Sequence, residues 1–416
     1  MIPFAKPFLG EEEANAAKEV IMSGWVTQGT KVREFEDLFA SCVGSKHACA
    51  VSSCTTAMHL ALLAVGIKPG DIVITVSHSF IATANVVRYC GAEPVFVDIE
   101  KNKFNMSPAN LKQCLSEDCE IRDGELFYRD VLSLAVGESP LCYLIQDKKA
   151  NVKNCHIGRV AAIMPVHQMG MPCDLEAILP LAYKFNLPIV EDAACSIGSE
   201  IKIDGKWEKI GKPHGDIACF SFHPRKVLTT GDGGMITTNN LKYDEKFRLL
   251  RQHGMSVTDT ARHNAKEIIF EEYVTTGFNY RMTDIQAAVG KEQLKRLPDL
   301  IKERRDIAKI YSKKLENIPW MRFPSEPEYC KSNWQSYPVS ILKNAPLSRN
   351  ELMQYLLNND VSTRPGITNI HNERAYVSKF SLKNSEWSRD SVILLPLFNG
   401  ISEEQIEYVT KAIKNA

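Results

Sequence analysis

The sequence predicts an α/β protein whose central sheet is mainly parallel and flanked by helices. Short apolar runs alternate with amphipathic stretches over the first half of the chain, and such alternation is typical of parallel strands joined by crossover helices. The chain has 416 residues, enough for a large core and two domains. We therefore expect a large sheet domain followed by a smaller one.

The expected elements of the large domain follow one another in a regular order. Apolar runs predict strands at residues 48–51, 72–76, 94–97, 160–165, 187–190 and 216–220. Amphipathic stretches between them predict helices that begin near Thr55, Ser79, Pro108 and Asp174. The last two strands lead into the segments that carry the candidate chemistry.

The C-terminal part reads as two helices followed by a small α/β unit. The helices are expected at residues 284–297 and 300–315, and the small unit at 337–341, 348–358, 361–363 and from Ser402 onward. The expected organisation is an N-terminal arm (1–34), a large domain (35–255), a connecting segment (256–300) and a small α/β domain (301–416).

Residues 117–156 break the alternation of strands and helices with a long polar excursion. A long excursion in a compact domain usually lies on the surface and is either functional or mobile. Two interpretations stay open for this insertion: a surface flap or a segment that contacts substrate.

The charge composition bears on the kind of molecule that the protein binds. Lys plus Arg and Asp plus Glu both number 50, so bulk charge gives no reason to expect nucleic acid or an acidic membrane surface. The start of the sequence lacks the pattern of a secretory signal, and no run is long and apolar enough to span a membrane. A small-molecule partner is expected.

The cysteine pattern indicates reduced thiols. Twelve cysteines are scattered without a CxxC pair, and several lie in apolar surroundings. This pattern favours buried, reduced thiols in a cytoplasmic protein, and neither disulfides nor a zinc site are expected.

Lys226 is the first candidate catalytic residue. It stands between the strand at 216–220 and a turn that contains Gly231, Gly233 and Gly234. A lysine partly desolvated in such a place has a lowered pKa and a nucleophilic amine that can form a Schiff base.

Two further groups fit a Schiff-base cofactor. Asp192 follows a buried strand, where open α/β sheets place their ligands, and a carboxylate there can keep the ring nitrogen of pyridoxal phosphate (PLP) protonated. Residues 51–56 read Val-Ser-Ser-Cys-Thr-Thr and open into an apolar helix. A helix N-terminus with such caps favours a phosphate group.

The order of these segments resembles the DegT/DnrJ/StrS sugar aminotransferases, which are PLP-dependent enzymes of fold type I, with the aspartate aminotransferase-like fold. The resemblance covers nearly the whole chain. It rests on segments that begin at residues 3, 23, 165, 191, 221, 251, 277, 334, 362 and 394, among them Pro-Val-His-Gln-Met-Gly, Glu-Asp-Ala-Ala and Gly-Phe-Asn-Tyr-Arg-Met-Thr-Asp.

The resemblance implies roles for the residues at the matching positions. Lys226 would anchor the cofactor and move a proton, and Asp192 would hold the ring nitrogen. The other expected cofactor contacts are Ser53, Cys54, Thr55, Phe80, Cys195, Ser221 and, from a neighbouring subunit, Asn279. The protein is therefore expected to be a homodimer with shared sites.

Two positions depart from the family pattern. Cys54 replaces the usual glycine of the phosphate loop and requires a negative φ there. Cys195 stands where glutamine or histidine usually bonds the phenolic oxygen of the cofactor, and a thiol is a weaker partner.

On the substrate side, the resemblance implicates residues from several segments: Trp25, Thr27, His167, Arg281, Arg364, His371 and Tyr376. For His167, a structural role and a catalytic role are equally open, since histidine titrates near neutral pH. Arg281 could pair with a donor carboxylate or a substrate phosphate.

The expected reaction is transfer of an amino group, from L-glutamate, to a keto-sugar that is linked to a nucleotide. The product would serve glycan or secondary-metabolite synthesis. The alternatives are transamination of a cyclic ketone such as a keto-inositol, and a non-catalytic regulatory member of the family. Lys226 argues against the sugar dehydratases of the family, which carry histidine at that position.

Overall fold

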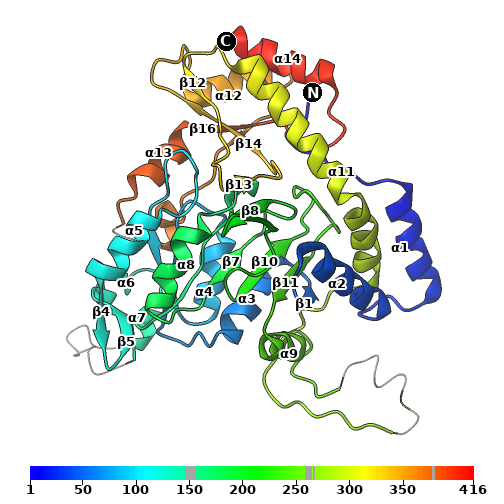
Figure 1. The fold of residues 1–416 in the computed structure, drawn as a ribbon, viewed down its shortest axis with the longest axis vertical. Helices are drawn as coiled ribbons and strands as arrows, with labels where there is room; N and C mark the ends of the chain where they lie inside the picture. Colours follow the sequence, from blue (N-terminus) through cyan, green and yellow to red (C-terminus); the bar gives the residue numbers. More distant parts are fainter. Residues whose placement is uncertain (146–155, 258–264, 266–267, 377–379) are drawn as a thin grey trace.

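The structure is a computed structural model, and it describes residues 1–145, 156–257, 265, 268–376 and 380–416 (Figure 1). All structural statements below concern these residues. The central sheet lies in the middle of the molecule, with helices on both sides and the C-terminal elements above it in the view of Figure 1.

Seven strands form the central sheet. They are β1 (His47–Val51), β2 (Ile72–Val76), β3 (Glu93–Val97), β6 (Val160–Ile163), β7 (Val190–Asp192), β10 (Ile217–Ser221) and β11 (Gly234–Thr238). Their hydrogen bonding gives two groups, β3-β2-β6 and β7-β10-β11-β1. Parallel bridges between Ile163 and Ile189 and between Val166 and Asp192 join β6 to β7. The expected parallel sheet is present as a mixed sheet, because β11 runs antiparallel to both of its neighbours.

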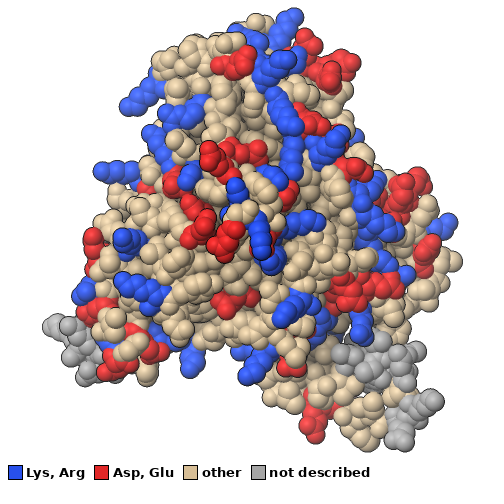
Figure 2. All heavy atoms as spheres, viewed as in Figure 1, with Lys and Arg blue, Asp and Glu red and all other residues tan. Residues whose placement is uncertain are grey.

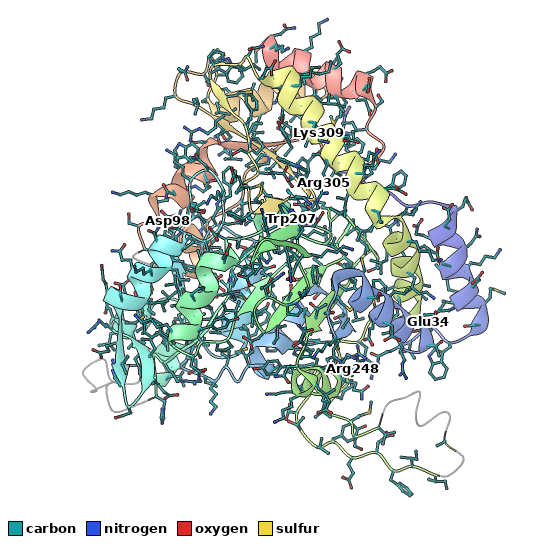
Figure 3. The ribbon with its side chains drawn as sticks, in the orientation of Figure 1. Glu34, Asp98, Trp207, Arg248, Arg305 and Lys309 are labelled. Carbon is teal, nitrogen blue, oxygen red and sulfur yellow. The ribbon has the colours of Figure 1, made fainter. Side chains whose placement is uncertain are left out.

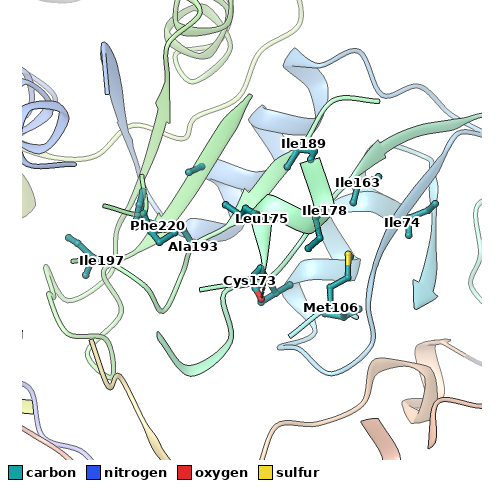
Figure 4. Close-up of a cluster of buried hydrophobic side chains, with 14 of the residues drawn as sticks. Ile74, Met106, Ile163, Cys173, Leu175, Ile178, Ile189, Ala193, Ile197 and Phe220 are labelled. Atoms are coloured by element: carbon teal, nitrogen blue, oxygen red, sulfur yellow. Dashed lines mark hydrogen bonds between the residues drawn. The ribbon is translucent and has the colours of Figure 1, made fainter. Parts of the chain in front are cut away.

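Helices cover both faces of this sheet. They include α3 (Cys54–Ala64), α4 (Ala82–Tyr89), α5 (Pro108–Gln113), α8 (Leu175–Lys184) and α9 (Leu241–Leu250). Leu175 and Ile178 of α8 pack towards the strands that carry Ile163 and Phe220 (Figure 4). These side chains are buried because α8 presents one apolar stripe to the sheet.

The N-terminal helices lie against one long helix. Helix α1 (Glu11–Ser23) and helix α2 (Thr30–Val43) contact α11 (Asp284–Leu315), which is one continuous helix of 32 residues. The expectation of two helices, at 284–297 and 300–315, is wrong. Pro298 lies inside the helix, where buried Leu297, Leu300 and Ile301 pack on both sides of it and offset its missing backbone hydrogen bond.

The C-terminal part contains a second sheet, with the order β12-β14-β16-β15. Its strands are β12 (Met321–Arg322), β14 (Tyr337–Ile341), β15 (Arg364–Pro365) and β16 (Val392–Leu395), and its helices are α12 (Arg349–Asn358), α13 (Lys383–Ser391) and α14 (Glu403–Lys414). The strand expected at 361–363 is absent among the described elements, since Val361 makes only a single bridge to Ile2. The predicted domain boundaries stay predictions.

The chain also forms another small sheet and several 3-10 turns outside the central sheet. Beneath α11 lies a three-stranded sheet of β8 (Glu200–Ile203), β9 (Lys206–Lys209) and β13 (Cys330–Lys331). Short 3-10 turns are η3 (Gln168–Gly170), η4 (Ile370–Asn372) and η5 (Arg374–Tyr376).

The described part of the 117–156 insertion is ordered. After the π-turn η1 (Cys114–Asp118) it forms a hairpin of β4 (Cys119–Arg122) and β5 (Glu125–Tyr128), followed by α6 (Val131–Leu134) and α7 (Leu141–Leu144). Residues 146–155 lie outside the described part. In Figure 1 the hairpin lies at the edge of the molecule, which places it on the surface.

Surface charge is mixed. Lys and Arg side chains are interspersed with Asp and Glu side chains over the face in Figure 2, in line with their equal numbers. In the described ranges no helix combines the length and the apolar character that crossing a bilayer requires.

Candidate active site

The carboxyl ends of three parallel strands bring the predicted cofactor residues together. Strands β1, β10 and β7 run in one direction. Gly234 of β11 is opposite both Val51, where β1 ends, and Ser221, where β10 ends. Asp192 is in register with Cys219 of β10. The phosphate loop, Ser221 and Asp192 therefore share one edge of the sheet, where α/β proteins bind their ligands.

Lys226 lies at this edge and meets Cys195. Its Nζ donates a hydrogen bond to the Cys195 Sγ at 3.0 Å. Burial lowers the pKa of Lys226, but the nearby Cys195, Asp192 and Cys54 outweigh burial and raise it. The expectation of a lowered pKa is therefore wrong for this arrangement, because the partners of the amine are negative or can become so.

Asp192 is almost fully buried, at 4% exposure, and both of its oxygens are bonded. Thr83 donates its hydroxyl to Oδ2 at 2.8 Å, and the Ala194 amide donates to Oδ1 at 3.2 Å. Since the Thr83 proton goes to Asp192, the Ser79 hydroxyl donates to Thr83 at 2.7 Å. Burial raises the pKa of Asp192 despite these bonds.

The start of α3 has the form of a phosphate-binding turn. Ser53 caps the helix, accepting from the Thr56 amide at 3.1 Å, and Thr56 closes a capping box. The first-turn amides of Cys54 and Thr55 have no acceptor inside the helix. A Cβ at Gly234 would come within 2.5 Å of the Ser53 carbonyl, so glycine there lets β11 approach the turn closely.

Cys54 fits its position in the loop. It opens α3 with helical geometry and is not among the described residues with positive φ, as the sequence required. Its side chain is buried, and burial together with Asp192 raises the pKa of its thiol well above the usual range. The missing glycine therefore causes no backbone strain.

His167 is fully buried, and the protein bonds both of its ring nitrogens. The Cys173 amide donates to Nδ1 at 2.9 Å, and Nε2 lies 3.0 Å from the Glu191 Oε2. Nδ1 therefore carries no proton, while Nε2 donates to the carboxylate. Burial raises the pKa of Glu191, but the hydrogen bond with His167 and the other nearby groups outweigh burial and lower the pKa. This arrangement gives His167 a structural role, and substrate contact stays a prediction.

One short loop holds the segments of both Cys195 and Lys226. Asn333 Nδ2 donates to the carbonyl oxygen of Cys195 at 2.9 Å, and Gln335 Nε2 donates to the carbonyl oxygen of Arg225 at 3.0 Å. Between them, Trp334 has a left-handed backbone, with φ of 50°. We call residues 333–335 the clamp loop.

Four further predicted residues are exposed or half-buried. Phe80 is 67% exposed, and its expected contact with the cofactor stays a prediction. Asn279 is exposed and bridges to Gln252. Arg281 bridges to Val51, the last residue of β1, and is half-buried. Arg364 is exposed on β15.

Trp25 and Thr27 belong to a loop tied to α11. The Thr27 carbonyl accepts from the Asp284 amide at 3.0 Å, and Asp284 Oδ1 accepts from the amide of Gly29 at 2.8 Å. The Trp25 indole donates to the Gln28 carbonyl at 3.3 Å. The loop is fixed, and its contact with substrate stays a prediction.

His371 and Tyr376 are buried rather than open. His371 Nδ1 lies 2.5 Å from the Ser77 hydroxyl, and its Nε2 lies 3.3 Å from Glu386. Tyr376 donates its hydroxyl to Asn85 at 2.8 Å, and its ring lies 3.9 Å from the Arg88 guanidinium. Both side chains join the C-terminal segment to the large domain, and their predicted contact with substrate is untested.

Sequence reasoning missed Thr83, Asn333 and Gln335. Thr83 lies four residues after Ser79, so helical spacing could have paired these two hydroxyls. Nothing local to Asn333 or Gln335 points to Cys195 or Lys226, because those contacts join segments that are 138 and 110 residues apart.

Comparison with known proteins identifies the chain. The DegT/DnrJ/EryC1/StrS aminotransferase family matches residues 7–120 and 142–414. The residues left out, 121–141, fall within the predicted insertion. The chain is 32% identical to the spore coat polysaccharide biosynthesis protein SpsC of Bacillus subtilis, over 100% of this chain and 96% of SpsC.

Solved structures agree with this match. The aminotransferase TlmJ from Streptoalloteichus hindustanus superposes with a TM-score of 0.82 at 28% identity, over 100% of this chain and 98% of TlmJ. The putative sugar aminotransferase Spr1654 from Streptococcus pneumoniae, solved in its PLP form, superposes with a TM-score of 0.80 at 24% identity, over 100% and 98%. The chain belongs to the DegT/DnrJ/EryC1/StrS family of aminotransferases.

Proposed function

We propose that this aminotransferase transfers an amino group from L-glutamate to a nucleotide-linked keto-sugar. The observation that carries the proposal is the single edge on which Lys226, the buried Asp192 and the open first turn of α3 meet. The similarity to SpsC, named for polysaccharide biosynthesis, supports a sugar as the acceptor.

The residues at the edge match the groups of PLP. The first turn of α3, the Thr55 hydroxyl and the Ser221 hydroxyl would hold the phosphate, and Asp192 would hold the ring nitrogen. Thr83 and the Ala194 amide fix the Asp192 carboxyl, so it needs no reorientation. When bound, PLP supplies a ring that accepts electrons from the carbon that loses its proton.

Lys226 would have two tasks. Its amine would bind the aldehyde of the cofactor and, once released, move a proton between the donor carbon and the cofactor. The clamp loop keeps the Lys226 turn close to Cys195, which keeps the released amine near the reacting atoms.

A second copy of this chain would complete the site. The described residues 252–257 and 268–279 form an arm in which Gln252 is bridged to Asn279 and Met255 to Tyr273. Its described side chains include exposed Ile268, Phe270, Tyr273 and Val274, between 58% and 85% exposed. Such an exposed apolar set marks an interaction surface. We assign it to the homodimer, in which Asn279 would reach the phosphate of the partner.

The proposal is tested in two half-reactions. Mixing PLP-loaded protein with L-glutamate should convert the cofactor spectrum to the pyridoxamine form without any sugar present, while D-glutamate should not. An unchanged spectrum would contradict the choice of donor. The amino form is then offered keto-sugar nucleotides and keto-inositols in parallel. Turnover of the keto-inositol alone would overturn the choice of acceptor.

A further inference from the structure

The contact between Cys195 and Lys226 brings a thiol and an amine together at this edge. The Lys226 Nζ lies 3.0 Å from the Cys195 Sγ. Both residues are partly exposed, so a small molecule in the site can reach them. An amine and a thiol at this distance can become covalently linked if the sulfur is oxidised.

The backbone holds the pair in this position. Asn333 Nδ2 bonds the carbonyl oxygens of both Cys195 and Ile197, at 2.9 and 2.8 Å. On the other side, the Lys226 amide donates to the His223 carbonyl at 2.8 Å, and Gln335 holds the carbonyl of Arg225. Two groups held in place react as an intramolecular pair at high effective concentration.

Other cysteines near the edge are less suited to react with Cys195. Cys54 and Cys219 are buried, and burial raises the pKa of both thiols well above the usual range. Lys226 is in direct contact with the Cys195 sulfur, at 3.0 Å, so its amine is the better placed partner for an oxidised Cys195.

We propose that Cys195 and Lys226 are a redox modification site, at which a peroxide links them through a reversible sulfur–nitrogen bond. In the first step the Cys195 sulfur attacks hydrogen peroxide: a sulfur–oxygen bond forms, the oxygen–oxygen bond breaks and one water leaves. The sulfur is oxidised by two electrons and the peroxide is reduced.

In the second step Lys226, which its raised pKa keeps as an ammonium, first gives a proton to solvent and then attacks the sulfenic sulfur as the neutral amine. The nitrogen–sulfur bond forms, the sulfur–oxygen bond breaks, and the hydroxyl leaves as water with one proton of the amine. One thiol, one amine and one peroxide thus yield one sulfenamide and two waters. Two equivalents of an added thiol reverse the link, giving back the Cys195 thiol and the amine and forming one disulfide.

The link would control loading of the cofactor. A Lys226 bound to sulfur has no amine for the PLP aldehyde, so oxidised protein cannot be loaded. Conversely, protein already loaded with PLP has its Nζ occupied and is protected from the link. The site therefore responds to peroxide when the lysine is free. This inference depends on the contact and not on the identity of the sugar.

The test uses full-length protein without added cofactor, in a Cys142→Ser background because Cys142 is the exposed one of the cysteines that the structure describes. After brief treatment with hydrogen peroxide and alkylation, proteolytic peptides are mapped by mass. We expect the Cys195 and Lys226 peptides joined, two hydrogen atoms lighter than their sum, and separated again by dithiothreitol. Spectroscopic uptake of PLP should be lost and recovered in parallel.

Control variants keep the proposal falsifiable. Cys195→Ser and Lys226→Arg should each abolish the joined peptide, and Cys54→Ala should keep it. Preloading with PLP should prevent it. A Cys195–Cys54 disulfide, or a Cys195 sulfinic acid with an unmodified Lys226, would overturn the proposal. If Lys226→Arg does not fold, the preloading experiment on the Cys142→Ser protein gives the same decision.

Discussion

The cofactor edge and the predicted sugar side of this site are built in different ways. At the cofactor edge, Asp192 is buried and bonded within the chain, and Lys226 is held against Cys195. On the predicted sugar side, Arg364 and Thr27 are exposed, while His371 and Tyr376 are buried against the large domain. The groups around Asp192 and Lys226 are bonded within one chain, whereas Asn279, the predicted contact to the phosphate of a partner, is exposed.

Burial explains this difference. A buried carboxylate needs fixed hydrogen-bond donors, so its neighbours must come from the same folded chain. Selectivity for a substrate can use exposed side chains that are desolvated only on binding. The family match spans both regions.

The contacts that support the two regions also come from different elements of the fold. Arg248, at α9, holds Glu36 of α2 and the Ala48 carbonyl, bracing β1 from below (Figure 3). Asp98 follows β3 and accepts from the amides of Asn384 and Ser385 at the start of α13. Asp98 thereby fixes the start of α13 in the C-terminal part, as an acidic N-terminal cap does.

The largest expected effects come from two variants that each remove a different residue of the shared site. Asn279→Asp would place a carboxylate against the partner's phosphate, and activity should fall about 100-fold because like charges cost several kcal/mol. Lys226→Ala should be inactive. Mixing the two variants after unfolding and refolding should restore about a quarter of wild-type activity, since half of randomly paired dimers hold one intact site.

The exposed Asn102→Asp variant is the matched control, because its carboxylate keeps the bond to Arg322. It should keep full activity alone. Mixtures of Asn279→Asp and Lys226→Ala that stay inactive would contradict the shared site.

Asp192→Asn should lower the rate of amino transfer about 1000-fold, since an amide cannot keep the ring nitrogen protonated. Asp216→Asn is its control at the other end of the sheet. Asp216 also has a raised pKa from burial and accepts from the Ile189 amide at 2.9 Å. Steady-state rates of both variants decide the point. Equal losses would mean that Asp192 acts only on stability.

His78 joins the large domain to the C-terminal segment. Protonation of His78 should therefore weaken the contact between these two parts in acid. It lies buried between Asn369 and Ser388, at 3.1 Å from each, and burial lowers its pKa to about 4 despite the Asn369 bond and nearby Asp98. A depressed histidine pKa means that the unfolded chain binds the proton first, at about pH 6.5. Stability is full above pH 6.5 and is lost as pH falls towards 4.

The loss from His78 should be on the order of 3 kcal/mol in the free energy of unfolding. Urea titrations from pH 7 to 4 should show it in the wild type and in His156→Gln, which changes an exposed histidine. The His78→Gln variant should show a smaller loss over that range. An equal pH dependence of all three proteins would refute the assignment.

The smallest expected effect is at two equivalent helix caps. It distinguishes a loss of stability from a loss of PLP binding. Ser53 caps α3 and Ser348 caps α12, and both close a capping box. Each change to alanine should cost about 1 kcal/mol of stability. Only Ser53→Ala should weaken PLP binding, measured by fluorescence titration. Weaker binding in both variants would show that stability, and not the phosphate turn, controls affinity.

Local sequence patterns predicted most of the strands and helices, and fewer of the contacts between the residues of the site. The strands that end at Val51, Asp192 and Ser221, and the helix that Ser53 caps, follow from apolar runs and capping residues. The shared edge follows from their parallel direction. Their chemistry was assigned through the family resemblance, and the individual site roles stay predictions.

What escaped prediction depends on long-range packing. Pro298 indicates a helix end by its local chemistry, yet apolar contacts on both sides keep α11 continuous. The raised pKa of Lys226 depends on a thiol 31 residues away. The burial of His371 and Tyr376 depends on elements more than 290 residues earlier in the sequence. No local pattern encodes such contacts.

The most direct test of the central claim is the place where the cofactor is bound. PLP-loaded protein is reduced with borohydride, digested and mapped by mass, beside Lys226→Ala and the exposed-lysine control Lys242→Ala. We expect the phosphopyridoxyl group on Lys226 in the wild type and in Lys242→Ala, and no specific attachment in Lys226→Ala. Attachment at another lysine in the wild type would contradict the account.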